Sequence, residues 1–295
     1  MGKALAEASP AAREVYARAD AALGEPISKL CFEGPLETLT LTANTQPALV
    51  ATSCAIMAAV RERLPDRAPP ACAAGHSLGE YSALVAAGGL SLEDAVKLCR
   101  LRGTAMQEAV PAGQGAMAAI MGLDPAQVAS ICEQAAEGEV VGPANFNAPG
   151  QIVIAGHAAA VGRASGLVSQ RGGKAIPLKV SAPFHCALMR PAAERLAPDL
   201  ARATMRPLAF PVVANFDGVP NSDPERARDL LIRQIDGPVQ WVATVERIVA
   251  QGVTHALELG PGKVLAGLCK RISKQLSVLS VNDVAAIDRV PEFLA

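Results

Sequence analysis

A glycine-bracketed serine narrows the choice of folds for this chain more than any other segment. Residues 75–79 read Gly-His-Ser-Leu-Gly, the pattern G-x-S-x-G. The uncharged run 71–74 before it is typical of a short buried strand, and Tyr81, Leu84 and Val85 after it recur at helical spacing. The sequence therefore predicts a strand, a sharp turn and a helix, with Ser77 at the turn.

This turn would present Ser77 as a nucleophile. We expect glycine at both Gly75 and Gly79 because a Cβ at either position would collide with the neighbouring turn. The backbone N–H of Leu78 and the helix dipole would then face an oxyanion formed at Ser77. A glycine-bracketed turn that carries a serine by chance is the alternative interpretation.

Composition limits the classes of protein to consider. The chain has 295 residues, of which 51% are hydrophobic, enough for one large domain or a domain with a smaller insert. A net charge of -1 argues against nucleic acid or an anionic membrane as the main partner. Seven cysteines without a C-x-x-C pair, and the lack of a secretory pattern, favour a reduced, cytoplasmic protein. The longest uncharged helical run, 48–60, is too short to span a bilayer.

Strands alternate with helices along most of the chain, which predicts an α/β fold with a parallel sheet and helices on both faces. Segment 31–41 reads as irregular. Between 113 and 180 the order becomes β-α-β-β-α-β, the ferredoxin-like pattern. We therefore expect an α/β-hydrolase-like core over 1–112 and 181–295, with residues 113–180 as an inserted ferredoxin-like subdomain.

A serine needs a base within hydrogen-bond reach, and the chain offers four histidines. His76 adjoins Ser77, where neighbouring side chains diverge, so it is a poor base. His157 suits a helix N-cap, and the strand alternation around His255 predicts a packed core residue. His185 lies in a loop that enters a helix, where functional residues are common. The pattern favours His185, with His255 as the alternative.

Four spaced motifs together resemble the malonyl-CoA:acyl carrier protein transacylase family. They are the segment 75–80, Arg102 in Leu-Arg-Gly, the segment Ser-Ala-Pro-Phe-His-Cys at 181–186, and Glu-Leu-Gly-Pro-Gly at 258–262. The likeness covers essentially the whole chain. An arginine on a helix is usually a solvated charge, so only this resemblance gives Arg102 a functional role.

The resemblance implies a ping-pong reaction. Ser77 would take the malonyl group from malonyl-CoA as an ester, with His185 acting first as base and then as acid. The phosphopantetheine thiol of an acyl carrier protein would collect it. The backbone carbonyl of Gln234 would orient His185, and the Leu78 N–H would bind the oxyanion.

The resemblance also implies which residues contact the substrate. Arg102 matches the arginine that clamps the malonyl carboxylate, and a guanidinium fork can hold a carboxylate by two charge-assisted bonds. His76 falls among the substrate-binding residues, and Phe184 matches the bulky residue that favours malonyl over methylmalonyl. No tightly bound cofactor and no metal are implied, and we expect a monomer.

At the N-terminus the sequence departs from the family pattern. The family begins with a strand and a G-Q-G-S-Q loop that supplies a second oxyanion donor, whereas Gly2-Lys3-Ala4-Leu5 matches the residues after that loop. We therefore expect an N-terminally shortened chain with a less stable sheet and turnover lower by roughly 100-fold or more. Adding the segment back and comparing rates would test this expectation.

Acyl carrier proteins are acidic, so we expect a basic docking face on this chain. Candidates are Lys263, Lys270, Arg271 and Lys274 on one helix, and Lys174 and Lys179 in the subdomain. For each of these residues, an ordinary solvated charge is the alternative interpretation.

Two other functions compete with the transferase. One is a serine esterase or thioesterase of the α/β-hydrolase type, using Ser77 with His255 and an intervening Asp. The other is a non-catalytic scaffold that binds acyl-CoA or a carrier protein.

Overall fold

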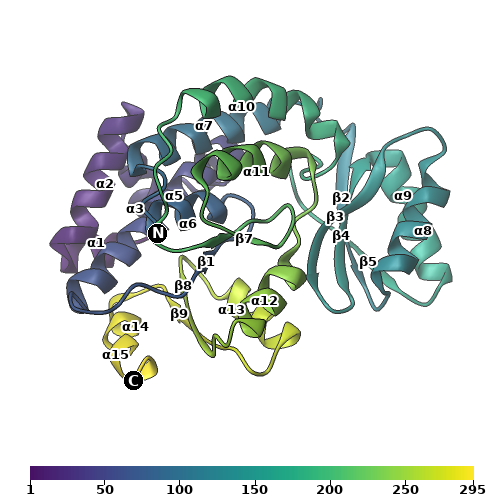
Figure 1. The fold of residues 1–295 in the computed structure, drawn as a ribbon. Coiled ribbons are helices and arrows are strands. Elements are labelled where there is room, and N and C mark those ends of the chain that lie inside the picture. Colours follow the sequence, from purple (N-terminus) through teal and green to yellow (C-terminus); the bar gives the residue numbers. More distant parts are fainter.

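The larger part of the molecule combines short strands with many helices. The computed structural model describes residues 1–295. Strand β1 (Ala73–Ala74) pairs in parallel with β6 (Val212–Val213), and β7 (Pro220–Asn221) joins β6 antiparallel. A separate parallel pair is formed by β8 (His255–Leu259) and β9 (Ser277–Val281). Figure 1 shows the strands of both sheets near the middle of the molecule, with helices around them.

The structure is thus α/β with mixed sheets, and it differs from the single parallel sheet predicted from the sequence. The parallel pairs are present, but they lie in two separate sheets. Near the serine the ladder is only two residues long. Prolines at 69 and 70 cannot donate to a ladder, Ala71 and Cys72 are not in a strand, and the turn at Gly75 ends the strand, so only Ala73 and Ala74 pair.

Helices provide most of the main core, in which 45 buried residues form one cluster. Ser9 caps α2, with Pro10 at its first position and Gly24 left-handed at its end, as expected for a helix with these boundary residues. The helices of this part are α1 (Lys3–Ala8), α2 (Pro10–Leu23), α3 (Ile27–Glu33), α4 (Leu36–Thr40), α5 (Thr42–Arg63), α6 (Gly79–Ala86), α7 (Leu92–Glu108), the 3-10 helix η1 (Ala187–Met189), α10 (Arg190–Arg202), α11 (Pro224–Asp236), α12 (Trp241–Ala250), α13 (Val264–Ile272), α14 (Val284–Asp288) and α15 (Val290–Phe293).

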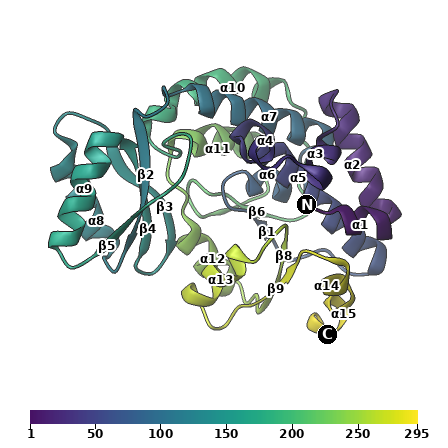
Figure 2. The same ribbon diagram turned by 180° about the vertical axis from the view of Figure 1, so that it is seen from behind.

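A third sheet lies at one end of the molecule and has its own core. It comprises β2 (Gly115–Met121), β3 (Val141–Ala148), β4 (Gln151–His157) and β5 (Lys174–Pro177), all antiparallel in the order β3-β4-β2-β5. Helices α8 (Pro125–Ala136) and α9 (Ala158–Gln170) pack against it, and Figure 2 shows both on the same face. The predicted succession of strand, helix, strand, strand, helix, strand is therefore present.

Two local predictions were wrong, and a third was correct only in part. Segment 31–41 is not irregular, because α3 and α4 occupy most of it and α3 buries Ile27 and Cys31. His157 is at the N-cap position of α9, as predicted, but its side chain makes no capping hydrogen bond. Its Nδ1 instead accepts a hydrogen bond from the Val140 N–H. His255 is exposed rather than packed in the core, because it opens β8, where its ring lies edge-on to that of Phe293.

None of the helices has the combination of length and apolar character that crossing a bilayer requires.

Candidate active site

Ser77 stands on a strained turn between β1 and α6. Its φ of 53° lies in the left-handed region, which non-glycine residues seldom adopt. A Cβ at Gly75 would lie 2.1 Å from the carbonyl carbon of Gly79, so this glycine is required for the tight turn. Gly79 is different, since a Cβ there would meet no atom within 4 Å. The expectation that both glycines prevent a collision was therefore correct only for Gly75.

Asn215, just after β6, fastens this turn. Its Oδ1 accepts the Ser77 N–H at 2.6 Å, and its Nδ2 donates to the Gly75 carbonyl at 2.6 Å. The side chain thus bridges the two residues around which the chain reverses direction. It is fully buried, so both bonds lie away from water.

Ser77 and His185 form a hydrogen-bonded pair although 108 residues separate them. Ser77 Oγ lies 2.8 Å from His185 Nε2, and His185 Nδ1 lies 2.9 Å from the backbone carbonyl of Gln234. A carbonyl can only accept, so Nδ1 carries the proton and Nε2 is left to accept from the serine. The imidazole is therefore oriented as a base toward the hydroxyl.

His185 is buried, with 4% of its surface exposed, and it too has a left-handed backbone, with φ of 60°. Burial, and after it the positive charge of Arg102, lower the pKa of His185 to about 3. The imidazole is therefore neutral near pH 7, as a general base must be.

Arg102 reaches the same serine from α7. Its Nη2 donates to Ser77 Oγ at 3.0 Å and to Gln234 Oε1 at 2.9 Å, while Nη1 donates to Gln46 Oε1 at 2.7 Å. A Cβ at Gly103 would lie 2.5 Å from the Thr42 carbonyl oxygen, so this glycine allows α7 to pack closely against α5. The guanidinium is 1% exposed, which contradicts the ordinary solvated interpretation of a helical arginine.

A buried carboxylate completes the surroundings of the serine. Glu80 Oε2 accepts from the Asn215 N–H at 2.9 Å and from Gln234 Nε2 at 2.7 Å. Burial raises the pKa of Glu80 to about 7, against the lowering effect of these hydrogen bonds and of Arg102. Gln234 Nε2 also donates to the Ser77 carbonyl at 3.0 Å.

The other predicted residues line the same turn. The Leu78 N–H has no hydrogen-bond partner and precedes the first residue of α6, so it is free to bind an oxyanion. His76 Nε2 lies 2.8 Å from Asn147 Oδ1, and its ring lies 5.6 Å from that of Trp241. Phe184 is half-buried next to His185 and packs against two core clusters.

The structure thus brings Ser77, His185, Arg102 and Gln234 together. His255 is absent from this group, because it is exposed and its Nδ1 lies 3.0 Å from Thr254 Oγ1. Sequence reasoning missed the polar residues behind the site, which are Gln46, Glu80, Asn147 and Asn215. Asn215 follows β6 directly after Ala214, and a polar residue just after a buried apolar run could have indicated it.

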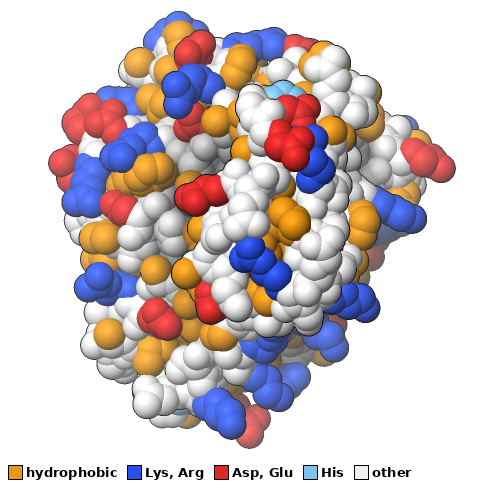
Figure 3. All heavy atoms as spheres, turned by 90° about the vertical axis from the view of Figure 1, so that its right-hand side faces the viewer, with side chains coloured by type: hydrophobic (Ala, Val, Ile, Leu, Met, Phe, Trp, Pro, Cys, Tyr) orange, Lys and Arg blue, Asp and Glu red, His pale blue; other side chains and the backbone are white.

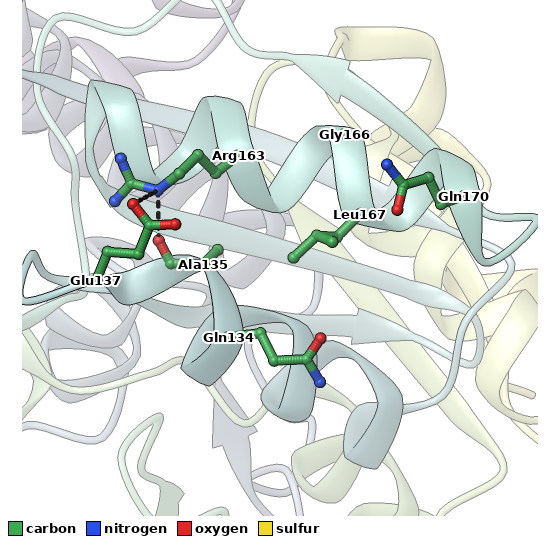
Figure 4. Close-up of a pocket in the computed structure, with 7 residues that line it drawn as sticks. All are labelled: Gln134, Ala135, Glu137, Arg163, Gly166, Leu167 and Gln170. Atoms are coloured by element: carbon green, nitrogen blue, oxygen red, sulfur yellow. Dashed lines mark hydrogen bonds and ion pairs between the residues drawn. The ribbon is translucent and has the colours of Figure 1, made fainter.

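A surface pocket elsewhere has no connection to this site. It lies between α8 and α9 and is lined in part by Gln134, Glu137 and Arg163 (Figure 4). Arg163 already donates to the carbonyls of Ala135 and Ala136 and pairs with Glu137, so the pocket offers no free charge.

Comparisons with known proteins agree with this geometry. Residues 1–292 match the acyl transferase domain family. The chain is 50% identical over 284 residues to the malonyl CoA-acyl carrier protein transacylase of Escherichia coli strain K12, covering 96% of this chain and 91% of the relative.

Two solved structures have the same fold as this chain. The acyl carrier protein S-malonyltransferase of Vibrio cholerae has a TM-score of 0.95 at 50% identity, covering 98% of this chain and 94% of its own. A malonyl-transacylase in complex with a type II PKS acyl-carrier protein has a TM-score of 0.95 at 47% identity, covering 99% and 94%.

Proposed function

The chain belongs to the acyl transferase family, and from that premise we propose that it transfers malonyl groups from malonyl-CoA to an acyl carrier protein. It is an acyltransferase, an acyl carrier protein S-malonyltransferase, as its relatives' names indicate. The observation that carries the proposal is the contact of one serine hydroxyl with both an imidazole and a buried guanidinium. An acyl group that ends in a carboxylate suits this arrangement.

In the first half-reaction, Ser77 Oγ attacks the thioester carbonyl of malonyl-CoA. The hydroxyl proton passes to His185 Nε2, which lies 2.8 Å away. A bond forms between Oγ and the carbonyl carbon, and the oxyanion accepts the Leu78 N–H. When the bond to sulfur breaks, the imidazolium returns the proton to the thiolate of coenzyme A.

The second half-reaction repeats these steps with the phosphopantetheine thiol as the nucleophile. His185 takes the thiol proton, the thiolate attacks the malonyl ester, and Ser77 leaves with the proton restored to Oγ. The Gln234 carbonyl keeps Nδ1 protonated throughout and takes the place of a carboxylate in the more familiar triads.

Arg102 holds the free carboxylate of the malonyl group in this proposal. In the structure its bonds go to uncharged oxygen atoms of Gln46, Ser77 and Gln234. A carboxylate can replace the serine oxygen and make stronger, charge-assisted bonds to the same guanidinium. Half-buried Phe184, beside His185, would limit the size of a substituent on the α-carbon of the malonyl group. His76 would contact the acyl or pantetheine group.

The fold, the cellular location and the oligomeric state of the chain are also part of the proposal. We describe the fold as an α/β-hydrolase-like core of residues 1–112 and 181–295 with a ferredoxin-like insert at 113–180, and we propose a cytoplasmic monomer without a tightly bound cofactor. The strand order of the small sheet and the seven free cysteines support these assignments.

Mass spectrometry of the intact chain after exposure to malonyl-CoA tests the function. We expect a malonyl adduct on Ser77, no adduct in Ser77→Ala, and slower formation by at least about 100-fold in His185→Ala. His255→Ala is the matched control and should acylate like the wild type, whereas an esterase that depends on His255 would lose activity.

Addition of a carrier protein distinguishes the remaining alternatives. A transferase moves the adduct to the phosphopantetheine thiol, while an esterase or thioesterase releases free malonate at the same rate with or without the carrier. A scaffold forms no adduct at all, and that result would reject the proposed function.

A further inference from the structure

The side chain of Gln234 links three parts of the site at once. Its Oε1 accepts from Arg102 at 2.9 Å, and its Nε2 donates to the Ser77 carbonyl at 3.0 Å and to Glu80 at 2.7 Å. The backbone carbonyl of the same residue orients His185. Gln234 is fully buried, with 0% of its surface exposed. Base, nucleophile and guanidinium are therefore all bonded to one residue at the end of α11.

Glu80 determines which way the Gln234 amide points. A carboxylate only accepts, so the amide must turn its NH₂ toward Glu80, and its oxygen then faces Arg102. The Asn215 N–H donates to the same Oε2 at 2.9 Å and holds the carboxylate in place. The reverse orientation would direct an amide NH₂ at a guanidinium, which cannot accept a hydrogen bond, and an amide oxygen at ionised Glu80, which cannot donate one.

The Gln234 amide lies between Arg102, which it contacts through Oε1, and the buried Glu80, which it contacts through Nε2. The order carboxyl group, amide, guanidinium forms a relay of hydrogen bonds in surroundings of low dielectric, where such bonds are strong. The uncharged side chain of Gln46 accepts a hydrogen bond only from Arg102 Nη1. The relay therefore fixes Nη2, the atom that also contacts Ser77.

We propose that Glu80 and the Gln234 side chain are positioning residues that hold the Arg102 guanidinium at the malonyl carboxylate. The proposal rests on the proposed function, because a fixed guanidinium matters only for an acyl group with a free carboxylate. Neither side chain touches the substrate. Their effect should appear as a preference for malonyl-CoA over acetyl-CoA, which lacks that carboxylate.

The experiment measures kcat/KM for malonyl-CoA and acetyl-CoA in matched variants. Gln234→Met keeps the volume and the backbone carbonyl but removes the amide, and we expect the malonyl preference to fall roughly 10- to 100-fold. Glu80→Met should produce a similar fall. Glu80→Gln retains an oxygen that can accept from both donors, so it should keep the preference within about threefold of the wild type.

Thr244→Val is the control for disturbance of the core. Thr244 is fully buried in α12, and its hydroxyl has no hydrogen-bond partner, so the change alters a buried polar residue outside the relay. Its malonyl preference should equal that of the wild type. Circular dichroism and thermal unfolding check each variant, and Gln234→Asn, which retains an amide but shortens it, replaces any Met variant that does not fold.

The outcomes separate the two proposals. If the wild type forms no malonyl ester on Ser77, the proposed function fails. If it does, and Gln234→Met or Gln234→Asn lowers both substrates equally or changes neither, the positioning role is rejected. A loss in Glu80→Gln as large as in Glu80→Met would also reject it, because the acceptor oxygen would then not be what matters.

Discussion

At the scale of single residues, the site is organised around one buried positive charge. Arg102 is almost completely buried, and the groups that accept its hydrogen bonds are uncharged. Such a charge acts strongly on every titratable neighbour, because few water molecules screen it. Its effect on His185 is opposite to its effect on Glu80: it disfavours the charged imidazole and favours the charged carboxylate.

The first prediction concerns Arg102→Met, which removes the charge but keeps an unbranched side chain. The pKa of His185, now about 3, should rise because one of the two main causes of its lowering is gone. It should remain below 6.5, since burial is the larger cause and persists. Titration of the imidazole followed by NMR measures this value. An unchanged pKa would mean that the guanidinium does not act on the base.

The second prediction concerns Glu80→Gln and the pH dependence of stability. Burial raises the pKa of Glu80 from 4.5 to about 7, so the folded state retains a proton that the unfolded chain releases between those values. The wild type therefore has this contribution in full below pH 4.5 and loses it as the pH rises through about 7, by about 3 kcal/mol in all. Glutamine cannot ionise, so the free energy of unfolding of the variant has no such decrease with rising pH.

Denaturant unfolding at about pH 5 and about pH 8 measures this difference. The free energy of unfolding of Glu80→Gln, relative to the wild type, should be higher at the higher pH. A relative stability that does not depend on pH would show that Glu80 titrates normally in the folded chain.

Sequence reasoning reached the residues proposed to contact the substrate and missed the polar residues behind them. Ser77 could be identified from the bracketing glycines and His185 from its loop, whereas Arg102 needed the family resemblance. Glu80 lies in the same motif as Ser77, yet a glutamate in the first turn of a helix is normally exposed. Its burial depends on Asn215 and Gln234, which are distant in sequence, so no local pattern could indicate it.

At the scale of elements, the turn between β1 and α6 requires a residue without a Cβ at Gly75 as much as it requires the left-handed backbone of Ser77. Gly75 faces the backbone of Gly79 and Glu80, while Gly79 faces open space. The two glycines are equivalent in the pattern G-x-S-x-G, and only the three-dimensional structure distinguishes them. A similar limit applies to α3, whose buried residues Ile27 and Cys31 pack in the main core although its sequence carries no strong local helix pattern.

The third prediction contrasts the two glycines. Gly75→Ala places a Cβ 2.1 Å from backbone atoms that cannot move without displacing α6, so it should lower the unfolding midpoint or prevent folding. Gly79→Ala adds a methyl group in open space at the start of a helix and should leave stability unchanged or raise it by up to about 1 kcal/mol. Thermal unfolding of both variants tests the contrast, and equal destabilisation would contradict it.

At the scale of the whole molecule, α13 connects the serine turn to a basic surface. Leu268 and Cys269 of this helix pack in a cluster with Trp241, whose ring lies 5.6 Å from that of His76. Lys263, Lys270, Arg271 and Lys274 are exposed on or beside the same helix, as are Lys174 and Lys179 in the small sheet and the segment after it. Figure 3 shows Lys and Arg side chains gathered along the lower part of the face at the small-sheet end of the molecule.

The fourth prediction follows from this arrangement, since an acidic carrier protein that delivers its thiol to Ser77 would dock over a basic face close to the turn. Lys270→Glu should raise the KM for the carrier roughly 10-fold, mainly at low salt, and leave the rate of malonyl-ester formation from malonyl-CoA unchanged. Arg271→Glu should act similarly, although it also breaks the contact of Arg271 with the Pro149 carbonyl in the turn between β3 and β4. Lys29→Glu, an exposed charge on α3, is the control. If all three variants had the same KM for the carrier, docking on α13 would be excluded, while the chemistry at Ser77 would stand.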